Sequence, residues 1–363
     1  MKKINLCLLV GGRSAEHEVS LISGSNVMKV ADKKKYRLTL VGIDKLGRWF
    51  LIKNSDPFLA SRPPKKIVFE ENASAAFVPG SQGRLIGIKD RSISKKIDVV
   101  FPVLHGTFGE DGTVQGLLEL ADVPYVAPDV VGSALGMDKD AQKRLLKEAE
   151  IPTAKFLIFR KKDFKKIKYA AISKKLGDTV FVKPANLGSS VGISKAGSKR
   201  DFGKALKEAF RYDNKILIEK AIAGRELECS VLGNENPQAS AVGEIIPHHE
   251  FYYYKAKYID KDGAGLAIPA KIPKKIADKF RALAVKTFRA LCCEGMGRVD
   301  GFWGKNGQLY ISEINTIPGF TSISMYPKLW EESGLPYSQL IDKLIELGIA
   351  RWKRNNKLKR DFD

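Results

Sequence analysis

A short stretch near the carboxyl end, residues 298–315, most constrains what this chain can fold into. Two runs typical of β-strands flank Asn306-Gly307, a dipeptide that favours a tight hairpin turn. If the dipeptide forms a two-residue turn, counting back along both runs places Asp300 opposite Glu313. Because side chains alternate along a strand, both carboxylates would project from the same face.

Two directly opposed carboxylates need a counter-charge, since their Cβ atoms would lie only about 5 Å apart and like charges there destabilise a hairpin. The same register places Arg298 opposite Asn315 on this face. Oxygen ligands from Asp300, Glu313 and Asn315 suit Mg²⁺ or Mn²⁺, above all when phosphate oxygens complete the coordination. The alternative is an exposed hairpin with a solvated polar face.

The overall composition is that of a globular protein. The chain has 363 residues, of which 44% are hydrophobic and 28% charged, enough for two or three domains. The formal net charge of +21 attracts polyanions in general. The lysines are scattered, however, and no RNA- or DNA-binding motif accompanies them. We interpret them as solvated faces and expect no specific nucleic-acid partner.

Targeting signals are absent from the sequence pattern. The first apolar run stops at Val10, which is too short for a secretory signal, and no later run reaches the length of a membrane span. The four cysteines show no paired spacing. We therefore expect a reduced, cytoplasmic protein without disulfides, a zinc site or membrane contact.

The first third of the chain predicts an open α/β domain. Strands are expected at 4–10 and 36–43 with a helix at 19–30 between them, whereas residues 53–95 are irregular and predict an insertion of hairpins. The glycine spacing after the first strand does not fit a dinucleotide fingerprint. Glu16, at the start of the helix, could hold a substrate ammonium group or simply cap the helix dipole.

A further strand, expected at 98–104, leads into a loop with three glycines at 105–112. The carboxyl end of a strand is the ligand-binding edge of an open α/β sheet. A lone histidine is more often structural than catalytic. Its place at this strand end nevertheless makes His105 a candidate site residue.

The middle of the chain predicts a grip on phosphates without a P-loop. Lys139 opens a helix, and a short strand ending in Lys183 precedes a glycine- and serine-rich hairpin at 185–193. Small residues let backbone N–H groups approach phosphates, and the two lysines can supply point charges. Each feature alone also fits an ordinary turn or strand end.

The next extended segment, 216–222, could bind the rest of a nucleotide. Its backbone near Lys220 and Ile222 could face an adenine edge, and Glu226 could bind a ribose hydroxyl. For Glu219 and Glu226 the alternative is an ordinary edge-strand charge.

The ordered motifs together resemble a known family. They are Gly-Gly-x-Ser-Ala-Glu at 11–16, Leu-His-Gly-x-x-Gly-Glu-Asp-Gly at 104–112, Met-Asp-Lys at 137–139, Gly-Ser-Ser-Val-Gly at 188–192 and Glu-Ile-Asn-Thr-Ile-Pro-Gly at 313–319. Over about residues 4–350 the chain closely resembles the D-alanine:D-alanine ligases, ATP-grasp enzymes of peptidoglycan synthesis. The resemblance implies an α/β and α+β architecture: an ATP-grasp fold behind an amino-terminal open α/β domain (Rossmann-like, pre-ATP-grasp).

The resemblance also implies three domains and a homodimer. They are an amino-terminal domain at 1–136 with the 53–95 insertion, a central ATP-grasp domain at 137–215, and a carboxyl-terminal ATP-grasp domain at 216–363. The last contains a loop at 247–269 that is long for a compact domain, as expected of a lid.

Site residues follow from the resemblance position by position. Residues at catalytic positions are Glu16, Ser189, Tyr258, Arg298, Gly319 and Ser324, and residues at substrate-binding positions are His105, Lys257 and Met325. Residues at ATP-binding positions are Lys139, Lys183, Glu219, Lys220, Ile222 and Glu226, and two Mg²⁺ (or Mn²⁺) ions would be held by Asp300, Glu313 and Asn315.

The resemblance predicts that ATP activates one D-alanine and that the amine of a second attacks it. Tyr258 is expected to hydrogen-bond Ser189, with Glu16 at the far end. Relatives that form a depsipeptide with D-lactate typically have His after the loop lysine, so Tyr258 favours an amine nucleophile. The alternatives are another ATP-grasp ligase or a carboxylase, a polyanion-binding protein that uses the +21 surface, and, weakest, a nicotinamide oxidoreductase.

Overall fold

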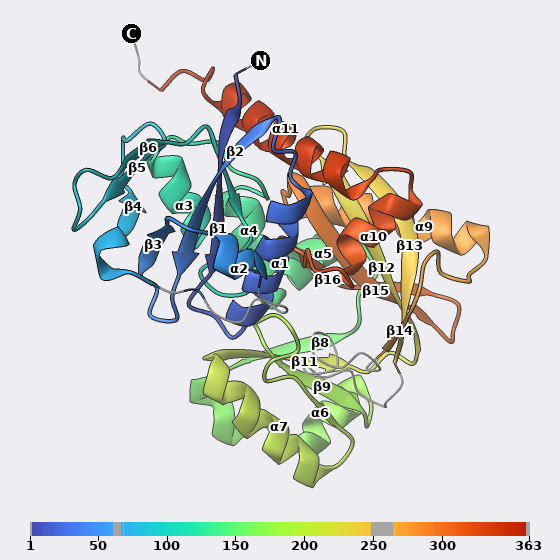
Figure 1. Ribbon diagram of the computed structural model, residues 1–363. Coiled ribbons are helices and arrows are strands. Elements are labelled where there is room, and N and C mark those ends of the chain that lie inside the picture. Colours follow the sequence, from blue (N-terminus) through green and yellow to red (C-terminus); the bar gives the residue numbers. More distant parts are fainter. Residues whose placement is uncertain (1, 61–66, 68, 248–263, 361–363) are drawn as a thin grey trace.

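The computed structural model describes residues 2–60, 67, 69–247 and 264–360, and its strands form three main sheets and one small sheet (Figure 1). Helices cover these sheets, and the chain passes through them in sequence order, from the blue amino-terminal part to the red carboxyl-terminal helices. Among the described residues, no helix combines the length and apolar character needed to cross a bilayer.

The amino-terminal sheet has the order β3-β2-β1-β7. Its strands are β1 (Ile4–Gly11), β2 (Tyr36–Ile43), β3 (Trp49–Ile52) and β7 (Val99–Pro102), and its helices are α1 (His17–Val30) and α3 (Thr113–Leu120). β1 is central, parallel to β2 and β7, and buried along its apolar run, as the sequence predicts. A Cβ atom at Gly11 would lie 2.2 Å from the carbonyl oxygen of Ile43, so only glycine allows the chain to turn here towards α1.

The described residues of the 53–95 segment include short hairpin strands, as expected, whereas its nature as an insertion stays a prediction. It contains α2 (Asp56–Ala60), a 3₁₀ turn at Glu71–Ala73, and the small antiparallel sheet β4 (Ala75–Phe77), β5 (Arg84–Gly87) and β6 (Ser94–Lys96). Buried Ala75, Phe77 and Leu85 join the core on one side of the amino-terminal sheet.

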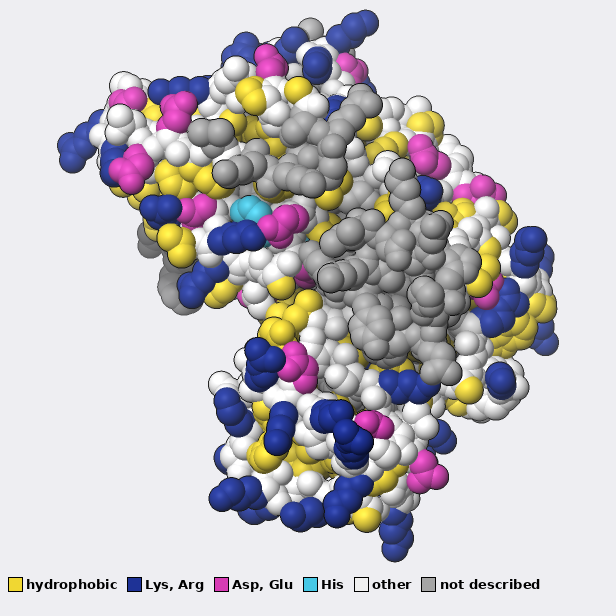
Figure 2. Space-filling view, turned by 60° about the horizontal axis from the view of Figure 1, so that its bottom comes forward, with side chains coloured by type: hydrophobic (Ala, Val, Ile, Leu, Met, Phe, Trp, Pro, Cys, Tyr) yellow, Lys and Arg dark blue, Asp and Glu magenta, His cyan; other side chains and the backbone are white. Residues whose placement is uncertain are grey.

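The central sheet has the order β10-β9-β11-β8. Its strands are β8 (Phe156–Arg160), β9 (Val180–Pro184), β10 (Ser194–Ala196) and β11 (Lys215–Lys220), with α6 (Tyr169–Leu176) and α7 (Lys199–Tyr212) packed beside them. Apolar residues of α7 recur at helical spacing and are buried. The central sheet and its helices form the lower part of the molecule (Figure 1). On the face drawn in Figure 2, Lys and Arg side chains are spread over the lower part and not gathered in one patch, which agrees with the prediction that the lysines lie on solvated faces.

Two short helical segments lie before and within the central sheet. Residues 161–176 form a 3₁₀ turn at Lys161–Lys166 followed by α6, and buried Ile167 turns the chain into the core between them. α4 (Val130–Met137) precedes α5, and its N-cap Asp129 accepts a hydrogen bond from the Gly132 N–H at 2.8 Å.

The carboxyl-terminal sheet is antiparallel with the order β14-β13-β12-β15-β16. Its strands are β12 (Gly224–Gly233), β13 (Gln238–Pro247), β14 (Ala264–Ala267), β15 (Gly295–Gly304) and β16 (Leu309–Asn315), and the helices around it are α5 (Lys139–Glu148), α9 (Lys274–Ala290), α10 (Met325–Glu332) and α11 (Tyr337–Asn355). α11 packs against both α1 and β15, so it links the amino-terminal part of the chain to the carboxyl-terminal sheet (Figure 1).

The domain division remains a prediction, but one expected boundary cuts through a strand. β11 pairs with β8 and β9 of the central sheet, so we propose to move the boundary from 215/216 to after Lys220. α5 likewise packs through Leu146 into the core of the carboxyl-terminal sheet, although it lies within the segment predicted as central.

The turn of the β15–β16 hairpin differs from the expected two-residue turn. The backbone N–H of Gly304 donates to the carbonyl of Gln308 at 2.8 Å, so the loop holds three residues. Gly307 lies in the left-handed region, with φ 77°, which glycine adopts without strain. The pairs next to the turn are therefore shifted by one residue from the predicted register.

The predicted register is nevertheless confirmed at the polar face. A β-bulge at Ser312 adds one residue to β16 and offsets the extra residue of the loop. Asp300 then pairs with Glu313, and Arg298 pairs with Asn315. The prediction of two opposed carboxylates was right although the turn that led to it was wrong.

Candidate active site

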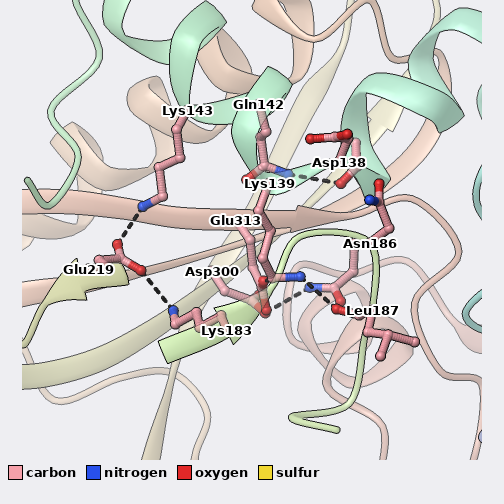
Figure 3. Close-up of polar contacts among 12 residues, drawn as sticks. Asp138, Lys139, Gln142, Lys143, Lys183, Asn186, Leu187, Glu219, Asp300 and Glu313 are labelled. Atoms are coloured by element: carbon pink, nitrogen blue, oxygen red, sulfur yellow. Dashed lines mark hydrogen bonds and ion pairs between the residues drawn. The ribbon is translucent and has the colours of Figure 1, made fainter. Parts of the chain in front are cut away.

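A buried row of charges links α5, β11 and β9. Glu219 accepts a hydrogen bond from Lys143 at 2.5 Å and pairs with Lys183 at 2.8 Å, so the carboxylate lies between two ammonium groups (Figure 3). Burial alone would raise the pKa of Glu219, but the charges of Lys143 and Lys183 together outweigh it and lower that pKa. Burial lowers the pKa of Lys143, which also donates to Thr153 at 2.7 Å.

Lys139, the first residue of α5, connects the glycine- and serine-rich hairpin to β16. Its ammonium group donates to the carbonyl of Leu187 at 2.6 Å and lies 3.4 Å from Oε2 of Glu313. Asp138 caps the helix through the backbone N–H groups of the next turn, which fixes the direction in which Lys139 leaves it. The structure thus brings both predicted phosphate-binding lysines to one region (Figure 3).

The hairpin at 185–193 has an unusual backbone. Ser189 (φ 49°), Ser190 (φ 60°) and Gly192 (φ 70°) all lie in the left-handed region, where non-glycine residues are uncommon and often mark functional sites. Such turns present backbone N–H groups that suit an anion. The hydroxyl of Ser189 donates to Glu16, so this predicted contact between the first and central domains forms.

A cavity of about 350 Å³ lies between the central and carboxyl-terminal sheets. It is lined by six of the residues predicted for ATP and metal: Lys183, Glu219, Lys220, Ile222, Glu226 and Glu313. Phe181, Ile245 and Phe302 also line it; the sequence reasoning missed them. A lining that combines aromatic, aliphatic and charged side chains suits a nucleotide.

The polar face of β15 and β16 carries the predicted metal ligands. Both Asp300 oxygens accept hydrogen bonds from the Arg298 guanidinium at 2.7 Å, and Asn315 donates to Asp300 at 2.8 Å. Among the described residues, no three His, Cys, Asp or Glu side chains gather closely enough to hold a metal alone. Two opposed carboxylates and one amide still fit Mg²⁺, which takes few protein ligands and completes its shell with phosphate and water.

His105 lies where the amino-terminal sheet meets the carboxyl-terminal domain. Its Nδ1 lies 3.0 Å from the carbonyl oxygen of Ile317, and its Nε2 lies 3.1 Å from the hydroxyl of Ser23. Burial lowers the pKa of His105 to about 4, so the ring is neutral at pH 7. Since Nδ1 faces a carbonyl, it carries the hydrogen and Nε2 accepts from Ser23.

Glu110 joins the same two segments, and the sequence reasoning did not single it out. It accepts hydrogen bonds from the backbone N–H groups of Gly106 and Ile317, both at 3.1 Å. Burial, together with the negative charge of Glu16, raises the pKa of Glu110 to about 8. This carboxyl group therefore fixes the 105–112 loop against residues 316–324, the segment between β16 and α10, which we call the strap.

That strap carries two more predicted site residues. Ser324 accepts a hydrogen bond from the Thr321 N–H at 2.9 Å, and a Cβ atom at Gly319 would lie 2.7 Å from the Ser324 hydroxyl oxygen. Met325 begins α10, but its side chain is buried with Ile245 in a small core cluster. Only the backbone of Met325 can therefore serve the predicted substrate contact.

Two predicted residues, Lys257 and Tyr258, lie outside the described residues. The described ends of the loop predicted as a lid are paired, with Pro247 of β13 opposite Ala264 of β14. The role of the loop remains a prediction.

Comparison with known proteins agrees with this geometry. The family model described as D-ala D-ala ligase N-terminus matches residues 5–128, and the model described as D-ala D-ala ligase C-terminus matches residues 145–346. The D-alanine–D-alanine ligase of Shouchella clausii is 48% identical over 361 residues, which are 99% of this chain and 98% of that protein. The chain belongs to the D-alanine–D-alanine ligase family. This is an ATP-using ligase family.

Solved structures of relatives extend the comparison. The D-alanine–D-alanine ligase from Coxiella burnetii superposes with a TM-score of 0.86 at 38% identity, over 98% of this chain and 97% of that one. The VanG D-Ala:D-Ser ligase from Enterococcus faecalis superposes with a TM-score of 0.84 at 34% identity, over 96% and 100%. Proteins that share this fold therefore include one named as a D-Ala:D-Ser ligase.

Three charged residues of the site were missed for identifiable reasons. Lys143 lies one helical turn after Lys139, and Glu228 lies two residues after Glu226 on the same strand, so periodicity would have placed each beside a predicted residue. Glu110 lies within the 105–112 loop, but no local sequence pattern indicates that it accepts a hydrogen bond from the backbone N–H of the distant Ile317.

Proposed function

We propose that this protein joins two D-alanine molecules into D-alanyl-D-alanine, with ATP converted to ADP and phosphate. One observation carries the proposal. The opposed carboxylates Asp300 and Glu313, the 185–193 hairpin, whose backbone suits a phosphate, and Glu16 all lie in one region. Family membership supplies the substrate class, since curated relatives carry this activity in their names. The product would feed peptidoglycan precursor synthesis.

ATP would bind in the cavity between the two sheets. Phe181, Ile222 and Phe302 offer apolar walls for the purine, and Glu226 offers an acceptor for a ribose hydroxyl. Lys139 and Lys183 would meet the phosphates. Asp300, Glu313 and Asn315 would hold two divalent cations, which when bound would neutralise charge on the transferred phosphoryl group.

The first D-alanine would lie between the amino-terminal domain and the strap after β16. Glu16 would hold the ammonium group of this D-alanine. The carboxylate of the D-alanine would accept the phosphoryl group and become an acyl phosphate. Arg298 and the backbone N–H of Gly319 would face the oxyanion that forms next. Losing one such donor typically costs about 10²–10³ in rate.

The second D-alanine would attack through its amine and release phosphate. The hydroxyl of Ser324 and the backbone N–H groups of Met325 and Tyr326 at the start of α10 suit its carboxylate, because a helix amino terminus favours an anion. Tyr258 is proposed to close the site beside Ser189 and to favour an amine over D-lactate. D-serine is the second candidate, because a relative of 34% identity is a D-Ala:D-Ser ligase.

A homodimer is also proposed from the family resemblance, and a cytoplasmic location from the unpaired spacing of the four cysteines. The net charge of +21 has no role in the proposed reaction.

The test is phosphate release from ATP and Mg²⁺ with four additions: D-alanine, L-alanine, D-alanine with D-serine, and D-alanine with D-lactate. Products are identified by mass. Release with D-alanine alone, giving the dipeptide, is expected. A mixed product with D-serine as the main species would move the second substrate, and no release under any condition would refute the proposal.

A further inference from the structure

Glu228 on β12 is a buried carboxylate that has no role in the proposed reaction. It is 6% exposed and lies opposite Asp300 in the β12–β15 register. Since Asp300 in turn lies opposite Glu313, three carboxylates stand in a row across three neighbouring strands. A row of like charges in a buried sheet requires a compensating cation.

Arg298 joins the first two carboxylates of this row. Its Nε and Nη2 atoms each donate to one oxygen of Asp300 at 2.7 Å, and Nε also lies 2.9 Å from Oε2 of Glu228. Asn315 donates its amide to Oδ2 of Asp300 at 2.8 Å. Both oxygens of Asp300 are thus engaged by hydrogen-bond donors.

A divalent cation needs the same Asp300 oxygens, since a carboxylate binds Mg²⁺ or Mn²⁺ through its lone pairs. If a cation binds both Asp300 oxygens on the side that the guanidinium fork now occupies, the guanidinium must release at least one contact, and the Asn315 amide must turn its oxygen to the site to act as a ligand. Arg298 must nevertheless stay in place, because its proposed role is at the oxyanion. Among the described residues, Arg298 forms ion pairs with Glu228 and Asp300, and of these Glu228 is the one that is not a proposed metal ligand.

We propose that Glu228 is a positioning residue: it holds the guanidinium of Arg298 in place when Asp300 binds a divalent cation and releases a contact with Arg298. The inference rests on the proposed function, which supplies the cation and the oxyanion. In both states the buried guanidinium faces a carboxylate, which avoids the large penalty of an unpaired buried charge. Arg298 therefore exchanges one partner and keeps the other.

Binding of Mn²⁺ to the protein–ADP complex, followed by electron paramagnetic resonance, tests the inference without turnover. In Glu228→Gln, Arg298 loses its ion pair with Glu228, so its contacts with Asp300 compete more strongly with Mn²⁺. The Kd for Mn²⁺ should rise about 10–100-fold, the usual range when a residue that supports a metal site from outside its ligands is lost. An unchanged Kd in a variant with the wild-type melting temperature would overturn the inference.

The matched control is Glu294→Gln. Glu294 accepts two hydrogen bonds from Arg354 of α11, at 2.7 and 2.8 Å, so the same substitution disturbs a bidentate pair outside the site. Its Kd for Mn²⁺ should equal that of the wild type. An equal rise in both variants would mean that general destabilisation, and not the partner of Arg298, sets the affinity.

Turnover separates an action through Arg298 from direct binding of the cation by Glu228. Glu228→Gln should lower kcat in the wild-type background but cause no further loss in Arg298→Ala, because no guanidinium is left to position. Additive losses would overturn the inference. A protein that shows the expected Mn²⁺ behaviour but joins no D-alanine would refute the proposed function and leave the role of Glu228 supported.

Discussion

Removing the carboxylate or one of the ammonium groups from the Lys143–Glu219–Lys183 row should have unequal effects on stability. Glu219 lies between the two lysines at 2.5 and 2.8 Å, and its side chain is 6% exposed. Glu219→Gln leaves two buried ammonium groups without the carboxylate that separates them. Lys143→Met leaves the Glu219–Lys183 pair intact and fills a similar volume.

The magnitudes follow from which charge is left behind. Removing one partner of a buried ion pair costs about 3–5 kcal/mol, and we expect Glu219→Gln to lower the free energy of unfolding by that amount. Lys143→Met removes the hydrogen bonds to Glu219 and Thr153. It also removes a buried charge whose desolvation lowers its pKa, so we expect a loss of only about 1–2 kcal/mol.

Urea unfolding of the nucleotide-free protein, followed by far-ultraviolet circular dichroism, measures both values. Lys274→Met serves as the control, because Lys274 forms an exposed pair with Asp278 on α9 and should change stability little. Equal losses in the two site variants, or a larger loss in Lys143→Met, would refute the reasoning.

Three further predictions concern single residues of the site. Arg298→Ala should lower kcat about 10²–10³-fold with a wild-type circular dichroism spectrum, and near-wild-type turnover would remove Arg298 from the mechanism. Because the pKa of Glu110 is raised from 4.5 to about 8, the folded state binds more protons than the unfolded state between these values, and stability should fall as the pH rises through this window. Glu110→Gln should flatten that slope in urea unfolding between pH 5 and 8, and an unaltered slope would contradict this origin. With Tyr258 in place, the purified protein should form no depsipeptide from D-alanine and D-lactate at neutral pH, as product masses would reveal.

Local patterns in the sequence predicted most strands of the three main sheets. The strands expected at 4–10 and 36–43 form, and most of their apolar side chains lie in the core. The long-range pairing was not predictable in the same way. β11 joins the central sheet through hydrogen bonds to β8 and β9, and no local signal in 215–220 distinguishes that sheet from the next.

The candidate site divides along the same line. Opposed Asp300 and Glu313 followed from alternation along two strands, even though loop and bulge each departed from the expected geometry. Glu110 and Lys143 act through partners at positions 317 and 219, far along the chain. Such contacts depend on how the sheets pack together, so a single sequence does not reveal them.

The central claim, ligation through an acyl phosphate, is tested most directly by the fate of the oxygen atoms of D-alanine. The purified protein is given ATP, Mg²⁺ and D-alanine labelled with ¹⁸O in its carboxylate, and the phosphate and dipeptide are analysed by mass spectrometry. Our account predicts that each phosphate released carries one ¹⁸O atom from the carboxylate of the first D-alanine. Phosphate without ¹⁸O, released together with the dipeptide, would contradict it.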